Sequence, residues 1–296
     1  MTSNKYYLFQ LFRHFVLIYP VYLLLFADKG LSLSEISLLL MIWSAPVVLL
    51  EIPSGILADI WSRKKLILIG SILHALCFTV WLFADGFALF ALGFVLWGIS
   101  ESTVSGALEA LLFDSLKSKG QSDRFDTVYS RGETIARITL ASAMILGGVT
   151  AEFLGFSFTL IGSVIALLTG GCLVFSFKEI NFDKSRYDKK ASVMKNGIVT
   201  FKDSFRFLFR SKLIFWPVFL CILVFGIYAV IDEYDPAVAS IFVPSVLWVA
   251  LWGTARFILE AVGAFFAPTI KRHFVKNNGL VPVVIGVCVC AAISML

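Results

Sequence analysis

One ionisable residue, Glu101, lies about midway along a long apolar segment near residues 87–110. A carboxylate inside such a segment is costly if the segment crosses a membrane, so it needs a charged partner or a function. Ser105 and Glu109 follow it at intervals of four and therefore share its face of the expected helix. One interpretation is an ion pair with a cation such as Arg137 on a neighbouring helix. The alternative is a role in binding or proton transfer.

Two further pairs of opposite charge occur four residues apart inside apolar segments, Glu133 with Arg137 and Arg256 with Glu260. Each pair can neutralise itself on one helix, which lowers the cost of placing it in a membrane. The sequence has no nucleophile–base arrangement, no metal-ligand spacing and no phosphate-cradling glycine loop. We therefore expect no enzymatic activity and no cofactor or metal.

The composition predicts a polytopic membrane protein of the all-α class. Of the residues, 59% are hydrophobic and 15% are charged, and the mean hydropathy is +0.89. The apolar segments are long and unbroken, whereas strands of a membrane barrel alternate in hydrophobicity. The five cysteines all lie within apolar segments, where they act as small buried hydrophobes. The net charge of +5 fits loops that face anionic lipid and does not indicate a nucleic-acid partner.

Apolar windows predict nine membrane spans, which are listed here with approximate bounds: 8–27, 35–55, 64–84, 87–110, 132–152, 156–177, 213–233, 240–266 and 279–296. Counting Lys and Arg on alternate sides places 22 of the 25 on one side, and only Lys29 on the other. Basic residues collect on the cytoplasmic side. We therefore predict a cytoplasmic N-terminus and a location in the cell (plasma) membrane.

A short polar turn, Gly55 to Lys65, separates the second and third spans and reads GILADIWSRKK. Gly55 lies four residues before Asp59, so it opens a gap on the helix face that carries this carboxylate. Asp59 also precedes the next helix, where it can accept from free amide groups as a cap. The bases that follow, including Arg63 and Lys64, mark the cytoplasmic side.

This turn resembles the signature of the major facilitator superfamily (MFS), which lies between the second and third helices of those transporters. The matching positions are Gly55, Leu57, Ala58, Asp59, Arg63 and Lys64. Ser62 replaces a glycine of that pattern, and Ile60 replaces a frequent arginine. Ser105-Gly106 and the stretch from Ala110 to Leu116 resemble a segment common among bacterial efflux-type members. By this resemblance, Gly55, Asp59, Arg63 and Lys64 form a gating motif.

The resemblance also implies which residues line a transport cavity, because helices one, four, seven and ten surround the cavity in that family. Glu101 would then contact the substrate or carry a coupled proton, and Arg137, Tyr22, Tyr228 and Asp232 are further candidates. Each has a simpler interpretation. Tyrosines near a membrane boundary often anchor the helix at the interface, and the acids near the outer end of the seventh span can simply be solvated.

The domain plan implied by the resemblance has two bundles. Residues 1–177 would form a six-helix N-terminal bundle, and residues 213–296 a partial C-terminal bundle of three helices. Residues 178–212 form a basic cytoplasmic linker, in which Ile198, Phe201, Phe205 and Leu208 recur at helical spacing. This pattern predicts an amphipathic helix on the membrane surface, and a flexible linker is the alternative.

The resemblance implies secondary active transport of small molecules by alternating access, as proton-coupled efflux. We expect partners to be a small-molecule substrate, protons and membrane lipids, with the chain acting as a monomer. The alternatives are a membrane enzyme, for which no residue cluster is found, and a transporter-derived scaffold or sensor that does not transport. The ninth apolar segment is still apolar at Leu296, so we also expect a truncated form of a twelve-span protein that does not transport alone.

The orientation can be tested by labelling single cysteines in intact cells. Cysteines introduced at Ser62 and Ser118 should react only from the cytoplasm, and those at Ser34 and Gly86 only from outside, because the loop bases are so unequally divided. Labelling of the Ser62 position by an impermeant reagent from outside would contradict the predicted topology.

Overall fold

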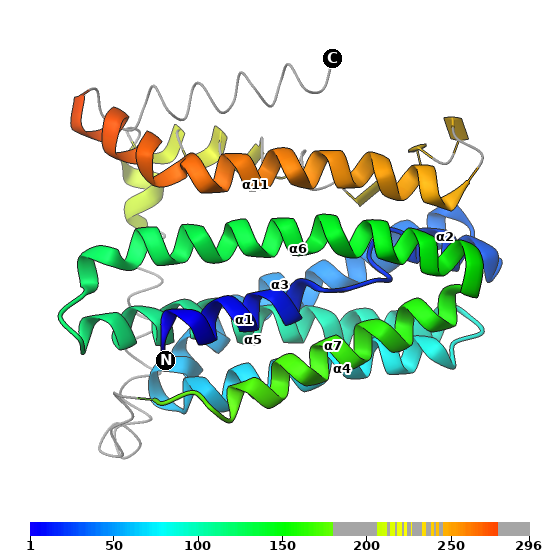
Figure 1. Cartoon of the computed structure of the whole chain (residues 1–296), viewed down its shortest axis with the longest axis horizontal. Helices are drawn as coiled ribbons and strands as arrows, with labels where there is room; N and C mark the ends of the chain where they lie inside the picture. Colours follow the sequence, from blue (N-terminus) through cyan, green and yellow to red (C-terminus); the bar gives the residue numbers. More distant parts are fainter. Residues whose placement is uncertain are drawn as a thin grey trace. The chain divides into compact units, whose positions relative to one another are not determined.

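A computed structural model of the chain describes residues 1–179, 206–211 and 245–277, with a few more residues between 214 and 242. The elements of this part are helices: α1 (Ser3–His14), α2 (Tyr22–Asp28), α3 (Leu33–Ile60), α4 (Arg63–Leu82), α5 (Phe87–Lys117), the 3₁₀ turn η1 (Ser122–Arg124), α6 (Phe125–Leu154), α7 (Phe156–Val174) and α11 (Val246–Asn277). Figure 1 shows the long helices running roughly parallel to one another. The all-α class is confirmed for this part of the chain.

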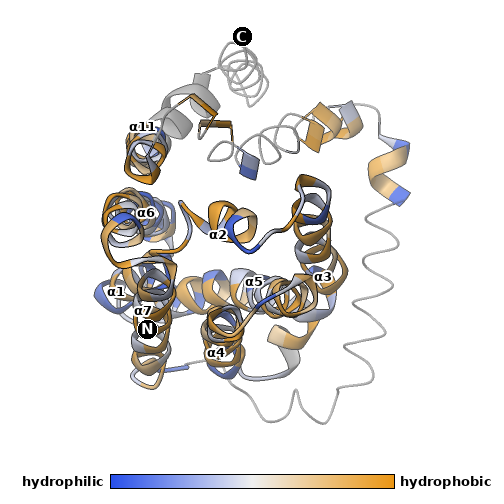
Figure 2. Ribbon diagram, turned by 90° about the vertical axis from the view of Figure 1, so that its right-hand side faces the viewer, coloured by the Kyte–Doolittle hydropathy of each residue, from blue (hydrophilic) through white to orange (hydrophobic). Residues whose placement is uncertain are grey.

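Six helices of the described part are long and apolar enough to cross a membrane: α3, α4, α5, α6 with η1, α7 and the first part of α11. They correspond to the predicted second to sixth spans and the eighth. Many large apolar side chains on them are exposed, such as Leu49 (71%) and Phe153 (74%). Figure 2 views the helices nearly end-on and shows how much of their length is hydrophobic. The ninth predicted span, most of the seventh and most of the amphipathic segment lie outside the described residues.

The chain divides into two compact units, residues 1–188 with 236–265, and residues 189–235 with 266–296. The candidate site lies in the first unit. The domain boundaries at residues 177 and 213 remain a prediction.

The first predicted span differs from expectation because it is two short helices and not one. Pro20 lacks an amide hydrogen and its ring is incompatible with a helical carbonyl four residues earlier, so the helix cannot continue through it. Turns replace the helix, with Tyr19 N donating to Val16 O at 3.2 Å. The freed amide of Ile18 donates to Ser163 Oγ of α7 at 3.1 Å. The break is thus satisfied internally, as a membrane interior requires.

Small residues let the helices approach closely. In α6, Gly147 lies against the backbone of Leu17, and Gly148 lies against Ala250 of α11. Figures 1 and 2 both show α6 and α11 side by side. In α5, Gly98 leaves room for the carbonyl of Trp43, which would lie 2.5 Å from an added Cβ. Gly147 and Gly148 therefore form a packing surface of α6, because small residues let neighbouring helices approach.

The largest part of the core is an aromatic cluster between α2, α4 and α5. Phe26 and Trp81 meet edge to face at 5.0 Å between ring centroids, and Trp81 meets Phe94 in the same way at 5.0 Å. The Trp81 indole donates to the carbonyl of Phe90 at 3.2 Å, so its one polar group is satisfied. This cluster fixes how α4 packs on α5, the helix that carries Glu101.

Two glycines of α5 provide a test of this packing. An added methyl at Gly93 would collide with the indole of Trp81, which is 2% exposed, whereas nothing lies within 4 Å of such a methyl at Gly106. We expect Gly93→Ala to destabilise the protein by about 1–3 kcal/mol. Gly106→Ala should be neutral or stabilise by up to about 1 kcal/mol, because alanine favours the helix. Thermal unfolding in detergent measures both, and equal effects would contradict the close contact at Gly93.

Candidate functional site

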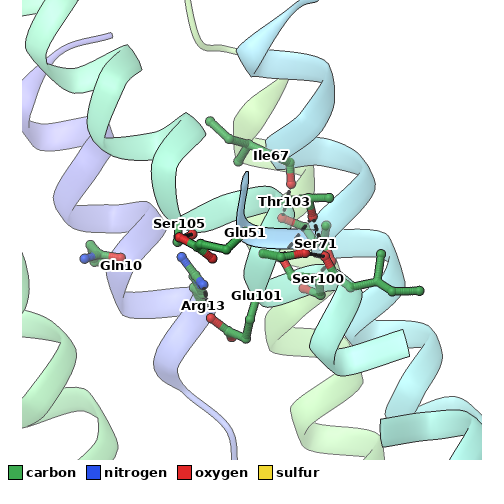
Figure 3. Close-up of polar contacts among 12 residues, drawn as sticks. Gln10, Arg13, Glu51, Ile67, Ser71, Ser100, Glu101, Thr103 and Ser105 are labelled. Carbon is green, nitrogen blue, oxygen red and sulfur yellow. Dashed lines mark hydrogen bonds and ion pairs between the residues drawn. The ribbon is translucent and has the colours of Figure 1, made fainter. Parts of the chain in front are cut away.

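An ion pair between Arg13 and Glu101 joins α1 to the middle of α5. Arg13 Nη2 lies 2.6 Å from Glu101 Oε2, and the two side chains are 13% and 31% exposed. Figure 3 shows the guanidinium directed at the carboxylate. The predicted ion pair of Glu101 therefore forms with Arg13, and the suggestion that Arg137 is its partner is wrong. Both charges are instead held together inside the helix bundle.

The local structure explains why Arg13 is available for this contact. Arg13 and His14 form the last turn of α1, where the helix dipole favours cations. The chain leaves helical geometry immediately afterwards, at Phe15. The break near Pro20 thus places a cationic helix end within the bundle, opposite the acidic residue of α5.

A second carboxylate, Glu51, lies next to this ion pair. It accepts a hydrogen bond from Ser105 Oγ at 3.3 Å, which is one turn beyond Glu101 on the same face of α5. Figure 3 shows Glu51, Ser105, Arg13 and Glu101 gathered from α1, α3 and α5. Glu51 was not predicted as a site residue, although it is an acid inside the apolar segment of the second predicted span, and the same feature singles out Glu101.

A second polar network connects α6 with α11. Arg137 lies 3.4 Å from Glu260 and 3.8 Å from Glu133, and Arg256 lies 3.8 Å from Glu260. The two predicted intrahelical pairs are thus confirmed, and Arg137 bridges them. Gln10 donates to Glu133 at 3.1 Å, which links this network to the helix that carries Arg13.

Aromatic residues pack beside the first ion pair. Trp97, four residues before Glu101, stacks on His74 of α4 with 5.0 Å between ring centroids, and Trp43 of α3 meets it at 6.0 Å. Tyr22 is 3% exposed and packs into the aromatic core, with its ring 6.3 Å from Trp97. Tyr22 is therefore a core residue in this conformation. Its assignment to a transport cavity stays a prediction.

The signature turn forms a separate polar cluster. Arg63 donates to Asp114 and to the carbonyl of Ala110 at 3.2 Å, both on α5. Lys64 donates to the carbonyls of Phe175 and Phe177 at 2.6 and 3.0 Å. These bonds tie the start of α4 to the ends of α5 and α7. Asp114 was not singled out by the sequence analysis.

The cap of α4 is not the expected one. Ser62 is the N-cap, and its Oγ accepts from Lys65 N at 3.2 Å. The carboxylate of Glu179 accepts from Ser62 Oγ at 2.5 Å and from Arg63 N at 2.7 Å. Ser62 and not Asp59 is thus the N-cap residue, because Asp59 lies within α3; the side chain of Asp59 is outside the described part. The serine that departs from the signature pattern thus has a structural role.

The remaining predicted residues do not come together with the ion pair in the described structure. Gly55 lies on α3 with nothing within 4 Å of an added methyl, which agrees with the expected gap. Tyr228 and Asp232 lie outside the described residues. No group of three potential metal ligands occurs among the described residues. The ion pair between Arg13 and Glu101, with Glu51 beside it, offers carboxylates paired with a cation or a hydroxyl. Such carboxylates can bind a cation, or take up and release a proton.

Comparison with known proteins gives consistent matches. The family model described as Major Facilitator Superfamily matches residues 8–296. The chain is 24% identical over 203 residues to the uncharacterized MFS-type transporter YxaM of Bacillus subtilis (strain 168). This alignment covers 65% of the chain and 47% of YxaM, so the chain spans about half the length of that curated relative.

Solved structures of a mutant peptide transporter, POT, share the fold. The complex with alafosfalin has a TM-score of 0.51 and 15% identity, and another structure of the mutant has a TM-score of 0.50 and 16% identity. Each comparison covers 93% of this chain and 67% of the transporter. At this identity the likeness shows the fold alone.

A double-mutant cycle tests the ion pair between Arg13 and Glu101. Arg13→Met should destabilise the protein by up to about 3–5 kcal/mol, because it leaves a carboxylate that is only 31% exposed without its partner. Adding Glu101→Met should recover most of this loss. Chemical denaturation in detergent gives the coupling energy.

The exposed pair between Lys29 and Asp85 is the control for this cycle. The two groups are 2.9 Å apart, but Asp85 is 90% exposed and screened by solvent, so its coupling should be much smaller. Additive effects of the Arg13 and Glu101 variants would contradict an energetically coupled pair.

Proposed function

The chain belongs to the Major Facilitator Superfamily, and from this premise we propose that it is a secondary active transporter of small molecules that works by alternating access. With its membrane-spanning helices it is a multi-pass membrane protein. We further propose that transport is proton-coupled efflux across the plasma membrane, with the N-terminus in the cytoplasm and the chain acting as a monomer. The export direction rests on the resemblance of Ser105-Gly106 and Ala110–Leu116 to efflux-type members.

The observation that carries the proposal is the ion pair between Arg13 and Glu101. A carboxylate at mid-helix is retained at a cost in free energy, and its contact with Arg13 crosses between two helices. Protonation of Glu101 would remove its charge and weaken the pair. Because α1 and α5 each carry one partner, such a change can be transmitted to the arrangement of the helices.

The signature turn supports a second part of the proposal, a latch on the cytoplasmic side. Arg63 is bonded to Asp114, and Lys64 to the end of α7. These contacts hold the cytoplasmic ends of three helices together. We propose that residues 1–177 move as one bundle, with residues 178–212 as the linker to the bundle of residues 213–296. Gly55 and Asp59 would lie on the face where this bundle closes.

The function is tested by a substrate panel in inverted vesicles, with and without an imposed pH gradient. We expect at least one compound to accumulate only when the gradient is present. Glu101→Gln should abolish gradient-driven transport but permit substrate exchange, because the amide keeps the shape of the side chain and cannot carry the proton.

The control is Glu152→Gln, at the exposed outer end of α6, which should leave driven transport unchanged. Normal driven transport by the Glu101 variant would exclude this residue as the proton carrier. If the unaltered protein moves no compound of the panel, transport by this chain is contradicted and the scaffold or sensor alternative gains support.

A further inference from the structure

Glu51 is a carboxylate without a cation partner among the residues that the structure describes. It lies within the span Leu33–Ala58 and is exposed, and Ser105 Oγ of α5 donates to it at 3.3 Å. A hydroxyl group cannot neutralise a carboxylate. An ionised group at such a position is expected to face a polar space and to serve a ligand or an ion.

The charges around Glu51 do not balance. Glu51 and Glu101 are two carboxylates, and Arg13 is the one guanidinium paired with them in Figure 3. Arg137 of α6 and Arg256 of α11 are already engaged, because both contact Glu260. The region around Glu51 is thus left with one negative charge that the described side chains do not compensate.

Two buried side chains near Arg13 each have one polar atom without a hydrogen-bond partner. Gln10 is 3% exposed and its Oε1 has no partner in the described structure, while His74 is 5% exposed and its Nε2 has none. Gln10 precedes Arg13 by one turn on α1, so both lie on the same face of that helix (Figure 3). His74 interacts electrostatically with both Arg13 and Glu101. Buried polar atoms without partners are uncommon, and a bound ligand with N–H donors would satisfy the amide oxygen.

A cluster of aromatic side chains adjoins these polar groups, and its members Trp43 and Tyr19 are partly exposed. Trp97 lies one turn before Glu101 on α5, with Trp43 at 6.0 Å and Tyr19 at 6.4 Å between ring centroids. Aromatic faces attract both cations and other aromatic rings. The neighbourhood of Glu101 therefore combines aromatic side chains with several hydrogen-bond acceptors and an excess of negative charge.

We propose that Glu51, Ser105 and Glu101 form a binding site for a protonated aromatic amine, with Glu51 as the principal counter-ion. The proposal rests on the proposed function, since this site would be the substrate site of the transporter. Ser105 and Gln10 provide further acceptors for the ammonium N–H groups, and Trp43, which is partly exposed, contacts the ring. Arg13 keeps Glu101 in place and discourages ligands with a larger positive charge.

The test is equilibrium dialysis of radiolabelled 2-phenylethylammonium against the purified full chain in detergent. We expect saturable binding that Glu51→Gln weakens at least about tenfold, because it removes the counter-ion. Glu51→Asp keeps the charge and should retain most of the affinity. The neutral isostere 2-phenylethanol should bind at least about tenfold more weakly than the amine.

The matched protein control is Glu152→Gln, a carboxylate of another span, which should bind the amine normally. No saturable amine binding, equal affinity for the alcohol, or unchanged affinity in the Glu51→Gln variant would overturn the proposal. If Glu51→Gln does not run as a monodisperse peak in gel filtration, Ser105→Ala takes its place and should also weaken binding. If the amine binds in this pattern but the protein shows no gradient-driven transport, the binding site is supported and the transport function is contradicted. If the protein transports but the amine does not bind in this pattern, only the binding site is contradicted.

Discussion

An ionised side chain cannot stay unpaired in the interior of a membrane protein without a large cost, and the first unit of this chain is arranged around that constraint. Glu101 needs a cation at the middle of α5. Arg13 can supply it because α1 ends at His14, inside the bundle. If the first helix continued beyond His14, its negative C-terminal end would lie further along the chain. Arg13 would then no longer lie at a helix C-terminus, where a cation is favoured.

The broken helix creates its own requirement, since irregular backbone in a membrane must find hydrogen-bond partners within the protein. Ser163 of α7 accepts from Ile18 N and so satisfies one of these groups. Gly147 of α6 allows the backbone at Leu17 to approach. The same segment is therefore held from two sides. The position of Arg13 therefore depends on how residues 17 and 18, a few positions further along the chain, pack against α6 and α7.

The signature turn shows how a departure from a family pattern can be accommodated. Ser62 replaces glycine, and it caps α4 through its side-chain oxygen. Glu179, just beyond α7, adds a carboxylate at the same helix start, where the dipole favours negative charge. Arg63 is then directed at Asp114 of α5. The turn is consequently bound to three helices, which suits a segment proposed to close one side of a transporter.

The sequence by itself determined the membrane class, six of the spans and the i,i+4 pairs, because hydropathy and helical periodicity are local properties of the chain. It also indicated that Glu101 needs a partner. Only the tertiary structure decided that the partner is Arg13 and not Arg137, and that Glu51 lies beside it. These contacts join residues from different helices, and their choice depends on where α1 breaks and how closely glycines let helices approach. Such distances are set by packing across the bundle, which no local pattern encodes.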